Sequence, residues 1–203
     1  MYSVTDSARY RGQMTAHAAL LRGVNVGGHR SVPAAVLRAL GSDAGFEAPA
    51  TLLTSGNLVL GAARQGTPAA ACTSPADVAR LLQGELRARL DLDVDVVVVT
   101  RADLDAVVAA NPFSQESQTE PSKVLVTFYL APPDPERLAA LDLSGFPERM
   151  VWAGGVAFTH YPAGAGTTRF TPAFLRRSLG VDGTARNWST VLKLRGLLAE
   201  REN

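Results

Sequence analysis

The chain has 203 residues, of which 46% are hydrophobic and 19% charged, and its formal net charge is +1. The near-neutral charge argues against a general nucleic-acid coat or a binder of anionic membranes, because both need a strong basic excess. The single cysteine, Cys72, excludes an internal disulfide and a cysteine zinc cluster. A reducing cytoplasm is therefore the expected compartment.

Metal binding and membrane insertion find no support in the sequence. His17, His29 and His160 are far apart and lack metal-ligand spacing such as His-x-x-x-His, so we expect no metal and no cofactor. No apolar run approaches the length of a membrane span. Residues 1–14 are polar and show no apolar periodicity, so they are expected to form a disordered leader, with Met14 as a possible true start.

The first half predicts the order strand, helix, strand, strand, helix, strand. Apolar residues at helical spacing mark the two helices, and a serine-proline start typical of a capped helix opens the second one. Gly56-Asn57 between two apolar runs predicts a two-residue hairpin turn of type II′. The expected elements are His17–Leu21, Pro33–Leu40, Thr51–Thr54, Leu58–Leu60, Ser74–Leu90 and Val94–Val99.

The second half predicts a similar order but lacks an evident fourth strand. Its expected strands are Lys123–Leu130, Arg149–Ala153 and Val156–His160, and its expected helices are Arg101–Ala110, Asp134–Leu141, Thr171–Leu179 and Trp188–Ala199, with Ser114–Ser122 as a polar loop. The fold class is therefore α+β, with two ferredoxin-like (split βαβ) subdomains that contain antiparallel sheets. We expect them to span residues 15–100 and 101–203, the second being degenerate and ending in two helices.

A glycine-rich turn, Arg22–Gly28, follows the first strand and is the main candidate site. Glycine permits positive φ, and successive N–H groups in such a turn can form a concave nest for an anion. The turn is neither a P-loop nor a dinucleotide fingerprint, because its glycine spacing is wrong for both. The alternative is a plain connection in which Asn25 supports positive φ and Arg22 forms an ion pair.

A second polar pair, Arg186-Asn187, lies at the start of the last predicted helix. Asn187 is expected to cap this helix, whereas the functional alternative makes the helix start an anion site with Arg186 as a bidentate clamp. Ser55 and Asn57 join the candidates from the predicted hairpin, where a turn role is the alternative. The predicted anion-binding residues are Arg22, Gly23, Asn25, Gly27, Gly28, Ser55, Asn57, Arg186 and Asn187.

Five segments together resemble a known family: Ala19–Gly28, Thr54–Val59, Asn111–Phe113, Tyr161–Gly166 and Arg186–Leu194. As an ordered set they are similar to the bacterial domain of unknown function 1697 family. The resemblance implies an α+β protein of two ferredoxin-like subdomains and implies no activity. Two positions depart from the pattern, since Asn111 stands where the family often has histidine and Ser189 where it often has asparagine.

These residues leave three functions open. The first is binding of a small anionic ligand, a metabolite or nucleotide with a phosphate or carboxylate, at the Gly/Asn/Arg-rich turns; no residue set points to catalysis. The second is a non-catalytic interaction or scaffold module. The third and weakest is nucleic-acid binding in a cleft between the subdomains by basic residues near the C-terminus, which the near-zero net charge disfavours.

Overall fold

The computed structural model of the chain describes residues 15–25, 31–166 and 168–202, and the predicted leader over residues 1–14 lies outside them. The described residues fall into two compact units: those up to residue 102 together with 194–202, and those from 103 to 193. The divide is next to the expected one at residues 100 and 101. The expected second subdomain ran to residue 203, whereas the last residues group with the first unit. There Arg201 Nη2 donates to the Ala48 carbonyl at 3.2 Å.

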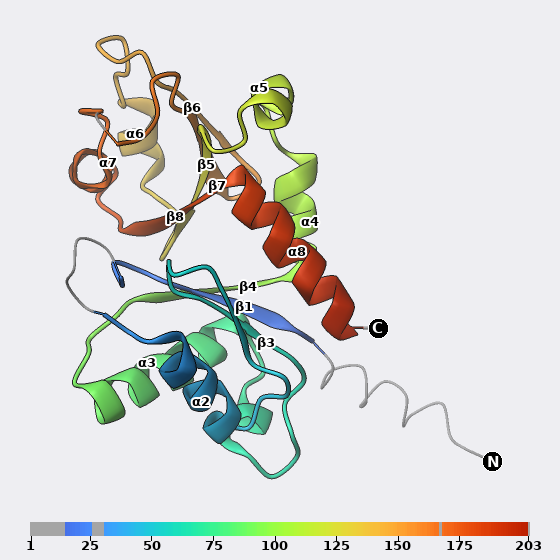
Figure 1. The fold of residues 1–203 in the computed structure, drawn as a ribbon. Coiled ribbons are helices and arrows are strands. Elements are labelled where there is room, and N and C mark those ends of the chain that lie inside the picture. Colours follow the sequence, from blue (N-terminus) through green and yellow to red (C-terminus); the bar gives the residue numbers. More distant parts are fainter. Residues whose placement is uncertain (1–14, 26–30, 167, 203) are drawn as a thin grey trace. The chain divides into compact units, whose positions relative to one another are not determined.

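The first unit is built on a four-stranded sheet in the order β2-β3-β1-β4, with every neighbouring pair antiparallel. Helices α2 and α3 lie on the same face of this sheet (Figure 1). The element order is the predicted βαββαβ of a ferredoxin-like subdomain. The bounds are β1 His17–Leu21, α2 Ala34–Ala44, β2 Ala50–Leu52, β3 Asn57–Leu60, the 3-10 turn Pro68–Ala71, α3 Pro75–Leu90 and β4 Val96–Thr100.

The core of the first unit forms where the apolar stripes of α2 and α3 meet one face of the sheet. Strand side chains alternate between the two faces, so Ala19 and Leu21 of β1 point to the same side. They are buried in one cluster with Leu40 of α2 and with Leu82 and Leu86 of α3. The predicted apolar face of α3 is therefore confirmed as a core face.

The connection between β2 and β3 differs from the predicted two-residue turn. Leu52 pairs with Asn57, so the loop comprises Leu53–Gly56. Leu53 and Gly56 both have positive φ, 60° and 69°. A Cβ on Gly56 would lie 2.3 Å from Val24 Cγ2, so this position needs glycine for space as well as for its backbone conformation. The type II′ prediction was wrong because the strand pairing ends earlier than the apolar run.

The second unit repeats the same strand order, β6-β7-β5-β8, and its pairs are also antiparallel. Fold class α+β with two antiparallel sheets is thus confirmed. The expected absence of a fourth strand was wrong, and α5 forms where a loop was expected. The bounds are α4 Arg101–Ala109, α5 Ser114–Thr119, β5 Val124–Tyr129, α6 Pro135–Ala139, β6 Arg149–Ala153, β7 Val156–His160, α7 Pro172–Leu179, β8 Gly183–Asn187 and α8 Trp188–Glu202.

Strand β8 was not predicted because its amino-acid composition is not typical of a strand. Its sequence contains glycine, alanine and asparagine, which are depleted in strands, and it has no run of β-branched residues. The strand is held in the sheet by pairing with β5, in which Leu125 lies opposite Asn187 at one end and Tyr129 opposite Gly183 at the other. Tertiary context therefore overrides the low strand preference of its residues. Among the described residues, no helix is both long and apolar enough to cross a bilayer.

Candidate functional site

A groove of about 350 Å³ lies in the first unit, next to the predicted Arg22–Gly28 turn. It opens between the start of α2 and the loop that joins β2 to β3. Its described lining combines hydroxyl and amide side chains with apolar ones and includes no charged residue. The lining residues are Asn25, Ser31, Val32, Pro33, Ala34, Leu37, Thr51, Leu53, Thr54 and Gly56.

Asn25 holds two walls of this groove together. Its Nδ2 donates to the carbonyls of Thr54 at 2.7 Å and Val32 at 3.2 Å, and its Oδ1 accepts from the Val32 N–H at 2.8 Å. The residue has φ 55°, so the interpretation of Asn25 as the residue that supports positive φ is confirmed. Because the side chain joins the β2–β3 loop to the segment before α2, it fixes the width of the groove.

The start of α2 contributes positive potential to the groove. Pro33 occupies the N-cap position, its side chain makes no cap hydrogen bond, and the first turn holds no acidic residue. The first-turn N–H groups of Ala34 and Ala35 have no acceptor within the helix. The partial positive charge of a helix start then acts on whatever occupies the groove.

Leu53 and Arg38 stand at the edge of the same groove. Leu53 has φ 60° and its side chain is 56% exposed, an uncommon combination because a bulky residue in the left-handed region is strained and an exposed leucine gains nothing from burial. Arg38 Nη1 donates to the hydroxyl of Thr51 at 3.2 Å, which brings a guanidinium beside a lining residue.

Arg22 does not line the groove. Its Nη1 lies 3.0 Å from Asp95 Oδ2, so the ion-pair alternative for this arginine is confirmed. Gly23 follows with φ 65° and is exposed, and no atom of the described residues lies within 4 Å of the place of a Cβ. Gly27 and Gly28 lie outside the described residues, so the structure describes the predicted turn only as far as Asn25.

The hairpin candidates Ser55 and Asn57 have structural roles. Asn57 is 1% exposed, and its Nδ2 donates to the Leu52 carbonyl at 2.9 Å and to Ser55 Oγ at 3.0 Å. These bonds stabilise the β2–β3 loop from inside. The turn role is thus confirmed for Asn57, and the loop presents Leu53, Thr54 and Gly56 to the groove instead.

Arg186 and Asn187 belong to the second unit, whereas the groove belongs to the first. Arg186 is 6% exposed on β8, and its Nη1 donates to Thr184 Oγ1 at 2.7 Å and to the Ala185 carbonyl at 2.8 Å. Burial lowers the pKa of Arg186 to about 10, which leaves it charged at neutral pH. Asn187 Oδ1 accepts from the Thr190 N–H at 2.9 Å, which confirms the predicted cap of the last helix.

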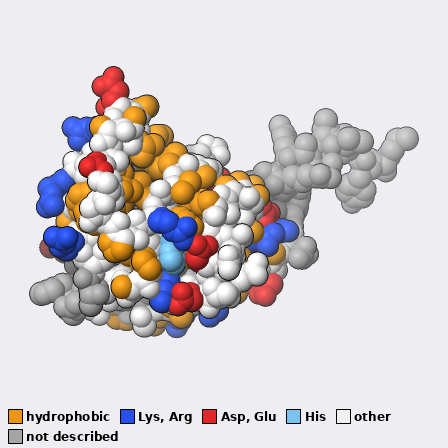
Figure 2. Space-filling view, turned by 90° about the horizontal axis from the view of Figure 1, so that it is seen from above, with side chains coloured by type: hydrophobic (Ala, Val, Ile, Leu, Met, Phe, Trp, Pro, Cys, Tyr) orange, Lys and Arg blue, Asp and Glu red, His pale blue; other side chains and the backbone are white. Residues whose placement is uncertain are grey.

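A polar cluster in the second unit was not among the predicted sites. His160 is 8% exposed, and its Nδ1 lies 3.4 Å from Arg149 Nη2. Arg149 also pairs with Glu116 and lies 5.1 Å over the ring of Phe113. Figure 2 shows basic and acidic side chains beside a histidine on the face viewed there. The predicted strands Arg149–Ala153 and Val156–His160 carry the signal for this cluster, because their pairing places Arg149 opposite His160.

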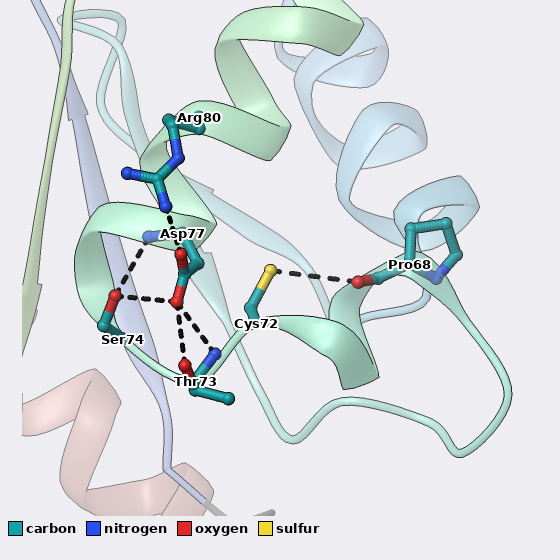
Figure 3. A network of polar contacts seen from close by, with 6 residues as sticks. All are labelled: Pro68, Cys72, Thr73, Ser74, Asp77 and Arg80. Carbon is teal, nitrogen blue, oxygen red and sulfur yellow. Dashed lines mark hydrogen bonds and ion pairs between the residues drawn. The ribbon is translucent and has the colours of Figure 1, made fainter.

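Cys72 lies beside a third polar network, which serves the start of α3 (Figure 3). Ser74 Oγ accepts from the Asp77 N–H at 3.2 Å and donates to Asp77 Oδ2 at 2.8 Å, so the predicted serine cap is confirmed. Thr73 adds two more bonds to the same carboxylate oxygen, both 3.0 Å long. Cys72 Sγ itself is 3.8 Å from the Pro68 carbonyl. The network completes a helix cap and contains no group poised for chemistry.

The described lining of the groove offers polar contacts but no evident catalytic group. Its described lining has hydroxyls and amides but no histidine, cysteine or carboxylate that could act as base or nucleophile. Among the described residues, no group of three potential metal ligands comes together.

Comparisons with known proteins place the chain in a family. A profile described as "Protein of unknown function (DUF1697)" matches residues 14–158. The fold resembles that of the conserved bacterial protein SP0830 from Streptococcus pneumoniae, with a TM-score of 0.66 and 21% identity over 91% of this chain and 99% of that one. No curated protein matches. The resemblance drawn from the five sequence segments is confirmed: the chain belongs to the DUF1697 family of proteins of unknown function.

Proposed function

We propose that the first unit binds a small anionic ligand, a metabolite or nucleotide that carries a phosphate or carboxylate, in the groove between the start of α2 and the β2–β3 loop. One observation carries this proposal: the uncapped first turn of α2 borders a groove whose described lining contains no acidic side chain. A single cysteine without a disulfide partner fits a cytoplasmic site of action.

The charge of the ligand follows from the groove's electrostatics. N–H groups without an acceptor in their own helix and the dipole of a helix start favour an anion, and these groups belong to Ala34 and Ala35 here. Arg38, whose Nη1 donates to the hydroxyl of Thr51, brings a guanidinium beside a lining residue. An anionic group at the helix start can also accept from the hydroxyls of Ser31 and Thr51, which line the groove.

The remainder of the ligand meets an apolar wall. Val32, Leu37 and Leu53 line the groove, and its volume of about 350 Å³ is within the range of ordinary ligand sites, about 300–1,000 Å³. An anionic head with a modest organic body fits this combination better than a bare inorganic ion. The glycine- and asparagine-rich turn contributes by shaping the wall, since Asn25 holds it to the β2–β3 loop.

The test exploits a helix start that can be blocked without harming the fold. Ala34→Glu places a carboxylate in the first turn of α2, where it suits the helix dipole but repels an anion in the groove. We expect this variant to keep its melting temperature and to lose the stabilisation that phosphate, sugar phosphates and nucleotides give the parent protein in a thermal-shift screen. The matched control is Ala76→Glu, the same change in the first turn of α3.

Two results would overturn the proposal. One is that no phosphate- or carboxylate-bearing compound raises the melting temperature of the parent protein. The other is that a compound does so equally in Ala34→Glu. The second candidate function, an interaction module, is favoured by the exposed and strained Leu53. It gains if Leu53→Asn abolishes a self-association that the parent protein shows in sedimentation.

A further inference from the structure

A cavity of about 150 Å³ lies within the second unit, between the sheet and α7. Leu125 and Thr127 of β5 and Ala185 of β8 form its sheet side, and Phe170 and Leu175 face them. Thr127 pairs with Ala185 in the β5–β8 register, so a small side chain on the edge strand leaves this space open. The cavity is partly open to solvent, so a small molecule can enter it.

Tyr129 supplies the one polar feature that the cavity leaves unsatisfied. The residue lines the cavity, and its hydroxyl oxygen is buried without a hydrogen-bond partner among the described residues. Burial raises the pKa of Tyr129 to about 12, so the hydroxyl stays protonated and remains a donor. Buried hydroxyls nearly always have a partner, and this one points to an acceptor that a ligand would bring.

Charge at the cavity is already balanced. Arg176 lines it, with a side chain that is 65% exposed, and its Nε lies 3.6 Å from Asp182 Oδ2. The other described lining residues are uncharged. The cavity therefore differs from the groove of the first unit: its lining is mostly apolar, its hydroxyl groups come from Thr127, Tyr129 and Tyr161, and its one charged side chain is paired.

From these contacts we infer that the second unit binds a neutral six-membered ring that carries one hydroxyl or carbonyl oxygen. An apolar cavity of about 150 Å³ is large enough for a benzene ring. The ring packs between Leu125, Phe170 and Leu175, and its oxygen accepts a hydrogen bond from the Tyr129 hydroxyl. This site is independent of the anion groove and uses none of its residues.

Phenol and toluene test the inference, because they have the same size and differ by a hydroxyl in place of a methyl group. We expect both to bind the full-length protein saturably in ligand-observed NMR titrations, with phenol bound more tightly. Tyr129→Phe should weaken phenol binding by up to about tenfold, the usual worth of a hydrogen bond, and should leave toluene binding unchanged. If phenol and toluene bind Tyr129→Phe with equal affinity, the tighter binding of phenol to the parent protein comes from the Tyr129 hydroxyl.

Filling the cavity gives the second arm. Ala185→Leu should abolish binding of both compounds, whereas Ala88→Leu on the exposed side of α3 should change neither. If Ala185→Leu fails to fold, Ala185→Val makes the same test with a smaller side chain. The inference is overturned if phenol does not bind the parent protein saturably, if phenol binds Tyr129→Phe as tightly as the parent, or if a folded cavity-filling variant binds both compounds normally.

Discussion

Arg22 and Asp95 are joined twice, once by side chains and once by main chains. Arg22 Nη1 lies 3.0 Å from Asp95 Oδ2, and the Arg22 N–H donates to the Asp95 carbonyl at 2.9 Å. The pair ties the chain just after β1 to the chain just before β4. The arginine expected to clamp a ligand therefore anchors the turn whose Asn25 shapes the groove.

The first prediction concerns this pair. Both side chains are partly exposed, at 33% and 41%, so Arg22→Ala should cost only about 0–1 kcal/mol of unfolding free energy. Urea unfolding of Arg22→Ala, Asp95→Ala and the double variant measures the coupling. Phosphate binding should persist in all three. If Arg22→Ala loses binding at unchanged stability while Asp95→Ala keeps it, Arg22 contacts the ligand after all.

The second prediction concerns the core of the first unit. Leu82 of α3 is 2% exposed and belongs to the cluster that covers the sheet, so Leu82→Ala should lower the unfolding free energy by about 2–5 kcal/mol. Its neighbour Gln83 lies outside that cluster, and Gln83→Ala serves as the control in the same denaturation series. A loss below about 1 kcal/mol for Leu82→Ala would mean that this face of α3 is not packed.

The third prediction concerns the start of α3. Ser74→Ala removes the cap and should cost about 0.5–2 kcal/mol in chemical denaturation at neutral pH. Hydrogen bonds from Ser74 and then Thr73 lower the pKa of Asp77 below its ordinary value of 3.8. A lowered folded-state pKa gives stability above the unfolded pKa that is lost as pH falls through the folded value.

Asp77→Asn checks that sign. The stability difference between the parent protein and Asp77→Asn should be largest at neutral pH and should vanish below the lowered pKa, where the carboxyl is protonated in both states. A difference that stays constant across this range would show that the charge of Asp77 adds nothing to the cap.

The fourth prediction concerns the single cysteine. Burial, followed by the nearby Asp77 carboxylate, raises the pKa of the Cys72 thiol, which leaves less thiolate at neutral pH. Cys72→Ser should therefore keep both the melting temperature and phosphate binding. A variant that folds normally but no longer binds phosphate would reveal a functional thiol.

The sequence predicted the elements that have strong local signals and missed those held by tertiary contacts. The apolar run at Val96–Val99 and the apolar face of α3 are readable because burial imposes their periodicity. Strand β8 cannot be recognised in the sequence, because Gly183 and Ala185 have little strand preference and are held in the sheet by pairing with β5. The length of the β2–β3 loop was predicted wrongly for a related reason, since it depends on where the strand pairing ends, at Leu52 and Asn57.

The candidate site was predictable only in part. Asn25 and its turn could be found because an asparagine in a glycine-rich segment marks an unusual backbone. The contribution of α2 could not be found, since an absent cap leaves no motif in Ser31–Ala34. Burial decides the role of Arg186, and no local pattern shows whether an arginine faces a ligand or the interior of its own unit.

Backbone amide NMR during a titration with inorganic phosphate tests the anion groove most directly. Anion binding at the start of α2 should produce saturable shifts of the Ala34 and Ala35 amides, because their N–H groups would face the anion, and far smaller shifts of Ala76 in the capped first turn of α3. Shifts that never saturate, or that are as large at Ala76 as at Ala34, would contradict this proposal.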